Sequence, residues 1–278
     1  MFDTKHPEVL DAVRRALAED IGSGDITTQL TVPAGRKASG AFYAREPMVV
    51  AGTELLPVIY DLLGGVESIE VLKLSGDRAE PGECLARVRG SARLLLTAER
   101  TALNFIQRLS GVATLAHQFS SAVADTECRI LDTRKTTPGL RVLEKMASAA
   151  GGITNHRQGL FDAILIKNNH ITAAGGVRAA LSAVAGQTIP VEIEVRTLAE
   201  LDEALECGAK RLLLDNLTPQ QARGWIARIA GRATIELSGG ITLETARAYA
   251  EAGADFVSAG AITHSARALD INFRLALE

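Results

Sequence analysis

The sequence predicts an α/β protein in which a mixed α/β N-terminal domain precedes an incomplete β/α barrel of six or seven strands. From residue 129 onward, short apolar runs alternate with helix-like segments, a pattern typical of parallel sheets. Most of these runs end in a charged residue or a glycine. Because the carboxyl ends of barrel strands form the face that holds the active site, the same pattern predicts an active-site rim.

Residues 1–111 are expected to form the N-terminal domain. Residues 6–20 predict an amphipathic helix. Strand-like runs then fill residues 36–90, where glycine and proline turns and a helix at about 53–63 interrupt them. This succession is typical of an α+β arrangement.

A long helix is predicted at about 91–110, with a regular apolar stripe. Glu99 is unusual on this helix because Leu95 and Leu103 are among its helical neighbours. A buried carboxylate is costly unless it is paired, so we expect an arginine or lysine nearby. The alternative is an exposed Glu99 at the edge of the stripe.

The barrel domain is expected to span residues 112–269. Its strands are predicted at about 129–132, 163–167, 191–195, 211–215, 233–237 and 255–259. The helices between them include Thr197–Cys207 and Thr242–Ala252, which begin at threonines suited to capping. Residues 270–278 are predicted to be a short tail without a strand role, packing back on the N-terminal domain.

Composition restricts the class of protein. The 278 residues are 47% hydrophobic and 23% charged with a net charge of −3, which argues against a nucleic-acid surface. The three cysteines match neither a disulfide framework nor zinc-ligand spacing, and favour a reducing cytoplasm. The N-terminus has an acidic residue at once and no apolar core segment, so we expect no signal peptide. We also expect no membrane span, because no apolar run approaches the ~20 residues needed.

Basic residues gather at the ends of the early barrel strands. Arg134 and Lys135 follow one strand, His156 and Arg157 lie in a glycine-flanked loop, and Lys167 ends the next strand. Arginine binds carboxylate or phosphate with two hydrogen bonds, and lysine supplies a compact charge. As a group they predict a substrate with several negative charges, although a solvated face is the simpler explanation for any one of them.

Acidic residues end the next two strands. Glu194 and Asp215 close neighbouring strands, and Glu192 points the same way as Glu194. Such carboxylates suit Mg²⁺ held through water and substrate phosphates, or could stabilise a cationic transition state directly. The simpler alternative is that they neutralise nearby lysines.

Glycines end the last two strands. Ser238-Gly239-Gly240 and the loop from Ser258 to Gly260 precede helix N-termini, where backbone N–H groups can bind a phosphate. The site thus predicts a 5′-phosphate, a second polyanion with metal, and a carboxylate-bearing acceptor. Phosphoribosyl pyrophosphate with an acidic acceptor fits all three, and neither a P-loop nor a strand-associated GxGxxG is present.

Several motifs are distinctive when taken together: TAERTALN (97–104), DTRKTTPGLR (132–141), NHRQGL (155–160), IKNNH (166–170), EDIGSGDITT (19–28) and SAGAITHS (258–265). With them the chain resembles the quinolinate phosphoribosyltransferase family over nearly its whole length. The resemblance implies transfer of phosphoribose to quinolinate with decarboxylation in NAD biosynthesis, with Mg²⁺ as cofactor. It also implies a homodimer, or a hexamer built as a trimer of dimers.

The resemblance implies a role for each matching residue. Arg100 is similar to a residue that completes the neighbouring subunit's site, with Glu99 as its structural companion. The other implied roles are quinolinate carboxylate binding by Arg134, His156 and Arg157, contacts to the pyrophosphate and ribose side by Lys135 and Lys167, metal and ribose binding by Glu194 and Asp215, and 5′-phosphate binding by Ser238, Gly239, Gly240, Ser258 and Gly260. Lys135, Glu194 and Asp215 are the expected catalytic residues.

Two positions depart from the family pattern. The family usually has aspartate where Asn168 stands and a small residue where Leu237 stands. Related molybdenum-transport-linked proteins lack an intact RKTTPG and NHR pattern, which this chain keeps.

Two other functions remain open. Lys167 at a strand end also resembles the lysine of a Schiff-base aldolase. A catalytically silent sensor of phosphorylated metabolites is the second alternative, although the presence of Glu194 and Asp215 disfavours it.

Overall fold

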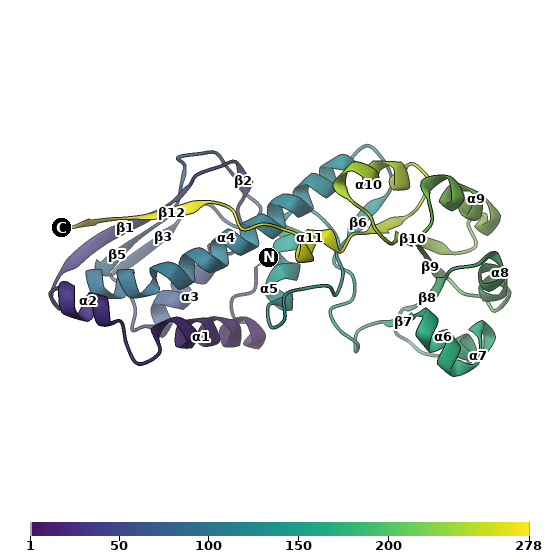
Figure 1. Ribbon diagram of the computed structural model, residues 1–278, viewed down its shortest axis with the longest axis horizontal. Coiled ribbons are helices and arrows are strands. Elements are labelled where there is room, and N and C mark those ends of the chain that lie inside the picture. Colours follow the sequence, from purple (N-terminus) through teal and green to yellow (C-terminus); the bar gives the residue numbers. More distant parts are fainter. Residues whose placement is uncertain (1, 278) are drawn as a thin grey trace. The chain divides into compact units, whose positions relative to one another are not determined.

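An antiparallel sheet of four strands, ordered β12-β1-β5-β3, forms the centre of the first of two units in this computed structural model, which describes residues 2–277 (Figure 1). This unit contains the described residues up to His117, together with Thr136–Gly152 and the residues from Thr263 onward. The second unit contains Gln118–Lys135 and Ile153–Ile262. Both units are assembled from separated segments, whereas the predicted domains are consecutive stretches of chain.

The first unit follows the predicted α+β order. Its main strands are β1 (Lys37–Ala44), β3 (Ser68–Val71), β5 (Cys84–Ser91) and β12 (Ile271–Leu277), and β2 (Met48–Val49) pairs separately with β4 (Arg78–Ala79). Its helices include α1 (Pro7–Ile21), α2 (Ile26–Thr31), α3 (Leu55–Leu62) and α5 (Arg141–Ala150). Alternate residues of β1 are buried, so one face of the sheet carries the core.

The helix predicted at about 91–110 is longer than expected. Helix α4 runs from Ala92 to Ala122, because its buried stripe continues through Val112, Ala116 and Phe119. Glu99 on α4 is half-buried, and the described residues include no ion-pair partner for it. The expectation of a nearby arginine or lysine partner is therefore wrong. Burial, together with the charge of Glu99, raises the pKa of Tyr60.

The prediction that the last residues have no strand role is also wrong. Strand β12 pairs antiparallel with β1 from Ala38↔Leu277 to Ala44↔Ile271. The ring of Phe273 packs on Phe42 at a centroid distance of 4.8 Å. A Cβ atom on Gly40 would lie 2.1 Å from the Phe273 ring, so glycine provides the space that this strand needs.

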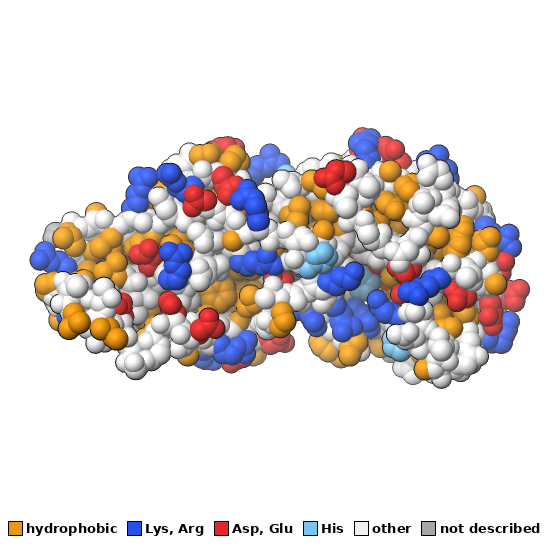
Figure 2. All heavy atoms as spheres, viewed as in Figure 1, with side chains coloured by type: hydrophobic (Ala, Val, Ile, Leu, Met, Phe, Trp, Pro, Cys, Tyr) orange, Lys and Arg blue, Asp and Glu red, His pale blue; other side chains and the backbone are white. Residues whose placement is uncertain are grey.

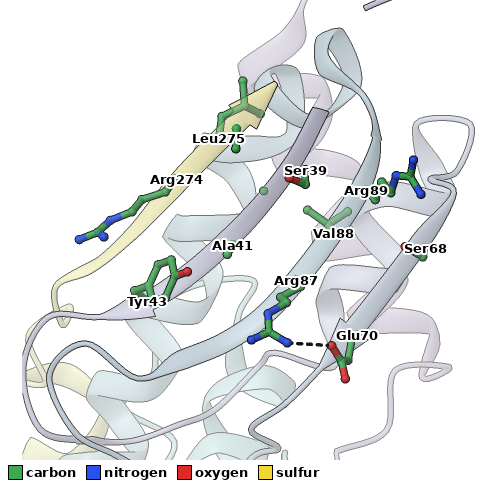
Figure 3. A pocket seen from close by; sticks show the side chains of 12 residues that line it. Ser39, Ala41, Tyr43, Ser68, Glu70, Arg87, Val88, Arg89, Arg274 and Leu275 are labelled. Atoms are coloured by element: carbon green, nitrogen blue, oxygen red, sulfur yellow. Dashed lines mark hydrogen bonds and ion pairs between the residues drawn. The ribbon is translucent and has the colours of Figure 1, made fainter. Parts of the chain in front are cut away.

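A hollow of about 460 Å³ lies on the face of the sheet that the helices leave open (Figure 3). Arg87, Arg89 and Arg274 line it; Arg87 pairs with Glu70 at 3.4 Å, and Arg274 lies over the Tyr43 ring at 5.0 Å. None of the predicted site residues lines this hollow.

The second unit is built on a parallel sheet of six strands ordered β6-β11-β10-β9-β8-β7. The strands are β6 (Arg129–Leu131), β7 (Ile164–Ile166), β8 (Val191–Val195), β9 (Arg211–Asp215), β10 (Thr234–Ser238) and β11 (Phe256–Ser258). All six lie within about two residues of the predicted ranges. The consecutive strands β6 and β7 occupy opposite edges of the sheet, with an isolated bridge from Leu131 to Thr154 beside β6. The incomplete barrel is confirmed.

Short helices follow the strands: α6 (Asn168–Ala174), α7 (Val177–Ala183), α8 (Leu198–Glu206), α9 (Pro219–Ile229), α10 (Leu243–Ala250) and α11 (Ala261–His264). Thr197 and Glu200 form a reciprocal capping box at the start of α8, and Thr242 begins α10 as predicted. Among residues 2–277, the structure contains no helix that is both long and apolar enough to cross a bilayer.

Candidate active site

The inner face of the parallel sheet carries the acidic residues. Glu192 and Glu194 are two residues apart on β8, and the register of β8, β9 and β10 places Asp215 and Glu236 on the same face. Glu194 is 4% exposed, and the register pairs Asp215 with Ser238 at the ends of β9 and β10. The strands thus bring together the carboxylates that the sequence placed at neighbouring strand ends.

An arginine that the sequence reasoning missed lies at this carboxylate pair. Nη2 of Arg196 is 3.0 Å from Oε1 of Glu194 and 3.2 Å from Oδ2 of Asp215. Asn216 also donates to Oδ2 of Asp215 at 2.8 Å. The sequence gives one sign of this role, because Arg196 directly follows the strand that carries Glu194.

Lys167 approaches the same pair from the end of β7. Its Nζ is 3.9 Å from Oε2 of Glu194, and its side chain is half exposed. Its backbone N–H donates to Nδ1 of His170 at 2.9 Å, which fixes the first turn of α6. The structure therefore brings Lys167 next to Glu194 at the strand ends.

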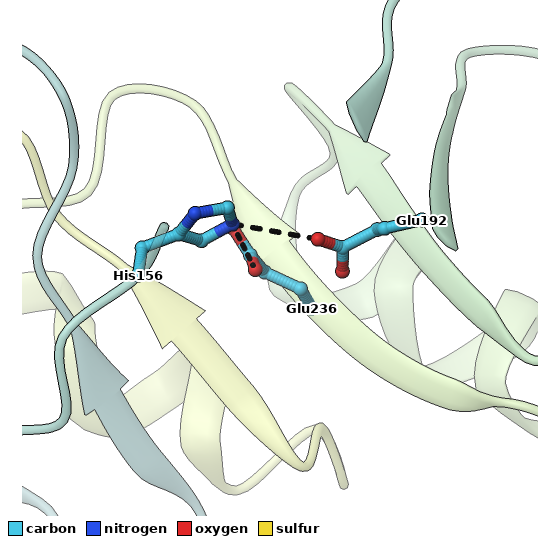
Figure 4. A group of neighbouring side chains, drawn as sticks. All are labelled: His156, Glu192 and Glu236. Atoms are coloured by element: carbon cyan, nitrogen blue, oxygen red, sulfur yellow. Dashed lines mark ion pairs between the residues drawn. The ribbon is translucent and has the colours of Figure 1, made fainter. Parts of the chain in front are cut away.

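His156 lies in a buried cluster with two glutamates (Figure 4). Its Nε2 is 3.4 Å from Oε2 of Glu192 and 3.2 Å from Oε2 of Glu236, while the backbone N–H of Arg157 donates to its Nδ1 at 2.7 Å. The backbone N–H of His156 donates to the buried Asp132 at 2.8 Å. Both ring nitrogens are thus engaged by the protein itself.

The protonation of this cluster is set by opposing effects. Burial lowers the pKa of His156, but hydrogen bonds and charge from Glu192 and Glu236 outweigh it and raise the pKa to about 9. The hydrogen bond from the backbone N–H of Arg157 opposes this rise in pKa, because Nδ1 of His156 can accept it only while that nitrogen carries no proton. Burial raises the pKa of Glu192. In either state of the ring, a proton at Nε2 faces the two carboxylates.

Arg134 and Arg157 contribute positive charge to the surroundings of this cluster. Burial, and after it the charge of Arg134, lowers the pKa of Arg157. Arg157 also donates to the carbonyl oxygen of Ala163 at 3.2 Å. Two half-buried cations whose charges influence each other favour an anion with more than one negative group.

The remaining predicted cations are more exposed. Lys135 lies two residues beyond Thr133, whose Oγ1 accepts its backbone N–H at 3.1 Å. Arg100 is exposed on α4 in the first unit. On the face drawn in Figure 2, basic and acidic side chains are interspersed. Positive charge at the site is therefore a local feature within a chain of net charge −3.

The late strands end in the predicted glycine loops. Ser258 donates from Oγ to Oγ of Ser238 at 3.0 Å, and the backbone N–H of Asn216 donates to the carbonyl of Ser238 at 2.9 Å. Gly239 has a φ of 104°, and a Cβ there would lie 2.3 Å from Oδ1 of Asn216. Only glycine fits this close approach. The loop leaves Gly240 exposed, and Gly260 directly precedes α11.

Comparison with known proteins decides the family. Residues 25–110 match the family described as quinolinate phosphoribosyl transferase, N-terminal domain, and residues 112–274 match the corresponding C-terminal domain. The chain belongs to the quinolinate phosphoribosyltransferase family.

Similar proteins agree along the full length. The nicotinate-nucleotide pyrophosphorylase [carboxylating] of Mycobacterium leprae is 44% identical, covering 99% of this chain and 100% of that protein. A probable enzyme of the same name from Bacillus subtilis is 38% identical over 98% of this chain and 95% of its own length. The solved structure of NadC from Streptococcus pyogenes has a TM-score of 0.94 at 37% identity, with both chains fully covered.

Membership of the quinolinate phosphoribosyltransferase family accounts for the arrangement of the sheet. The nicotinate-nucleotide pyrophosphorylase structure from Francisella tularensis has a TM-score of 0.92 at 36% identity, covering 99% of this chain and 100% of that one. The incomplete barrel is therefore shared with solved members, and the residues at its strand ends can be read in terms of the family's chemistry.

Proposed function

We propose that this chain transfers the phosphoribosyl group of phosphoribosyl pyrophosphate to quinolinate with loss of CO₂, giving nicotinate mononucleotide and pyrophosphate. The observation that carries the proposal is the division of one strand-end rim by charge. Arg134 and Arg157 form its cationic part, and Glu194 and Asp215 form its anionic part. A dicarboxylate acceptor and a ribosyl donor need these two environments side by side.

The acidic pair fits a magnesium ion. Oε1 of Glu194 is buried and has no hydrogen-bond partner. The same oxygen forms an ion pair with Arg196, and Oδ2 of Asp215 forms a second ion pair with that guanidinium. Mg²⁺ prefers oxygen ligands and often binds through one or two carboxylates together with water and substrate phosphates. Held there, it would neutralise charge on the departing diphosphate.

The chain's own residues position and stabilise the reactants. The pyridine nitrogen forms a bond to ribose C1 as the bond from C1 to pyrophosphate breaks, and Glu194 and Asp215 offset the positive charge that develops on the ribose. Lys135 and Lys167 balance charge on the pyrophosphate side. The C2–carboxylate bond then breaks, its electron pair stays on the pyridinium ring, CO₂ leaves and C2 takes up a proton.

Arg134 and Arg157 hold the carboxylates of quinolinate in this proposal. His156 serves the same site through Arg157, because its Nδ1 accepts the Arg157 N–H and its Nε2 faces two glutamates. The loops at Ser238–Gly240 and Ser258–Gly260 bind the 5′-phosphate with backbone N–H groups. No covalent enzyme intermediate is needed, so positioning should supply much of the rate.

A direct assay tests the proposal. Quinolinate, phosphoribosyl pyrophosphate and Mg²⁺ are incubated with the protein, and nicotinate mononucleotide is measured, with nicotinate as the comparison acceptor. Turnover of quinolinate supports the proposal, and turnover of nicotinate alone would overturn it. A borohydride-trapped substrate adduct on Lys167 would instead favour aldolase chemistry.

We also propose a homodimer, or a hexamer of three dimers, in which Arg100 completes the neighbouring subunit's site. Support comes from the exposed position of Arg100 on α4 and from the TAERTALN motif around it. Light scattering gives the oligomeric state directly. A protein that is monomeric at working concentration and fully active would contradict this arrangement.

The cytoplasm is the proposed location. Cys84, Cys128 and Cys207 are all free thiols in the structure, which suits a reducing compartment. Cell fractionation with an antibody to the chain would test this, and recovery outside the cytoplasm would reject it.

A further inference from the structure

We propose that the Arg196 side chain serves as the counter-ion of Glu194 and Asp215 while the divalent-cation position is empty, and moves to the substrate diphosphate when the metal binds. Arg196 follows β8, and its Nη2 lies 3.0 Å from Glu194 and 3.2 Å from Asp215. One guanidinium nitrogen thus bridges the ends of two neighbouring strands, where the proposed function requires a metal ion.

The acidic pair needs a counter-charge when no metal is bound. The side chain of Glu194 is 4% exposed and that of Asp215 is 14% exposed, so water screens their repulsion poorly. Lys167 is 3.9 Å from the other oxygen of Glu194, too far for a hydrogen bond. Arg196 is therefore the cation that contacts both carboxylates, while Lys167 adds positive charge at longer range on the side of Glu194.

The contact between Arg196 and Glu194 is suited to exchange. Although the two groups are close, Oε1 of Glu194 forms no hydrogen bond, so charge attraction holds this pair without directional bonding. The Arg196 side chain is 45% exposed, and within the described residues its ion pairs are those with Glu194 and Asp215. Its backbone N–H donates to Glu200 at 2.7 Å, which anchors the main chain while the side chain remains able to rotate.

A divalent cation and this guanidinium cannot both occupy the position between the same oxygens, since like charges would then lie within a few ångströms. A diphosphate resolves the conflict, because it accepts the arginine's planar donors and brings negative charge with the metal. The free protein should therefore bind divalent cations weakly, and Arg196 should add to diphosphate affinity. The second half of this inference rests on the proposed function.

The first test measures Mn²⁺ binding to the substrate-free protein by electron paramagnetic resonance. Arg196→Ala should bind Mn²⁺ about three- to tenfold more tightly than the wild type, the scale expected for removing one nearby positive charge. Arg228→Ala is the matched control, because Arg228 is a similarly exposed arginine paired with a carboxylate of α8. It should leave Mn²⁺ affinity unchanged.

The variant Glu194→Gln tests whether the change in Mn²⁺ affinity arises at the Glu194 carboxylate. The gain from Arg196→Ala should disappear in the Glu194→Gln background. Unchanged or weaker Mn²⁺ binding in Arg196→Ala, or a gain that persists without the Glu194 charge, would overturn the counter-ion role.

The second test measures inorganic pyrophosphate binding with saturating Mg²⁺ by calorimetry. Arg196→Ala should weaken pyrophosphate binding by roughly tenfold, and Arg196→Lys should recover part of it, because lysine keeps the charge but loses the planar fork. Unchanged pyrophosphate affinity would overturn the transfer step. Absence of quinolinate turnover by the wild type would reject the proposed function and leave the Mn²⁺ result standing, so the two failures are distinguishable.

Discussion

At the scale of single residues, the contacts of His156 determine how the cationic part of the site is held. His156 is held by Glu192 and Glu236 at Nε2 and by the Arg157 N–H at Nδ1, so its orientation is fixed from both sides. The fixed imidazole in turn holds the backbone of Arg157, whose guanidinium donates to the carbonyl oxygen of Ala163. Preorganised cations of this kind bind a dicarboxylate without reorganising at the moment of binding.

Arg134→Ala should separate the two substrates. We expect quinolinate to bind about ten- to a hundredfold more weakly, as for the loss of a charged hydrogen-bonding partner. Phosphoribosyl pyrophosphate binding should change little, because its proposed contacts are Lys135, Lys167, Glu194, Asp215 and the glycine loops, and none of them is Arg134. Calorimetric titration with each substrate measures both affinities, and equal losses would contradict the role given to Arg134.

His156→Leu should destabilise the fold. Glu192 and Glu236 are 6% and 2% exposed, and without the imidazole they lose the donor between them. Removing one partner from a buried charged group costs about 3 kcal/mol or more. Adding Glu236→Gln to His156→Leu should recover part of the loss, since one buried charge is removed. Denaturant unfolding measures both effects, and simple additivity of the two changes would reject the coupling.

At the level of elements, the C-terminal segment of the first unit is held by ion pairs as well as by strand pairing. Arg267 pairs with Glu46, which lies in the turn after β1, and Glu46 also accepts the backbone N–H of Asp270 at 2.8 Å. Arg108 on α4 pairs with the buried Glu144 of α5 at 2.7 Å and donates to the carbonyl oxygens of Thr263 and Ala266. The chain leading into β12 is thereby attached at two places.

Glu46→Gln should give a pH-dependent loss of stability. The hydrogen bond from Arg267, with that from Asp270, lowers the pKa of Glu46 from 4.5 to about 2. Because the folded-state pKa lies below the unfolded value, the stabilisation is present above pH 4.5 and is lost as pH falls toward 2. At pH 7 the variant should lose about 1 kcal/mol, as for a partly exposed pair.

Thermal unfolding of wild type and Glu46→Gln across pH 2 to 7 measures the difference. The two curves should converge between about pH 4.5 and pH 2, the window set by the lowered pKa. A difference in melting temperature that stays constant through this range would show that the Glu46 charge is not its source.

Prediction from sequence succeeded where the signal was periodic. The strand ranges of the parallel sheet and the capping threonines Thr197 and Thr242 follow from local patterns. Glu236 was within reach, because it lies two residues before Ser238 on one strand. For Arg196 the sequence offered only its position after the strand that carries Glu194, because its contact with Asp215 depends on a side chain that reaches the neighbouring strand. The partner of β12 is also non-local, and seven residues do not reveal it.

On the scale of the whole molecule, the proposed function predicts that active sites are shared between chains. Arg100→Ala and Glu194→Gln should each be inactive alone if Arg100 reaches a neighbour's site. Mixing the two variants under conditions that exchange subunits should restore activity, because one site of each mixed dimer then contains both native residues. Steady-state assays of the mixture measure the recovery.

Each variant mixed with itself is the control for the subunit-exchange experiment. Arg100→Ala mixed with itself, or Glu194→Gln mixed with itself, should stay inactive after the same treatment. No recovery in a mixture shown by mass spectrometry to contain mixed dimers would place Arg100 in its own chain's site, or in none.

The pairing of β12 with β1 also determines the order in which this protein can fold during synthesis. The parallel sheet is complete once residue 258 has been made, whereas the N-terminal sheet receives its edge strand only with residues 271–277. Until then β1, one of the earliest strands translated, presents an unpaired edge, and such edges readily pair with other chains. Premature termination near the C-terminus would thus damage the first part of the protein to be made.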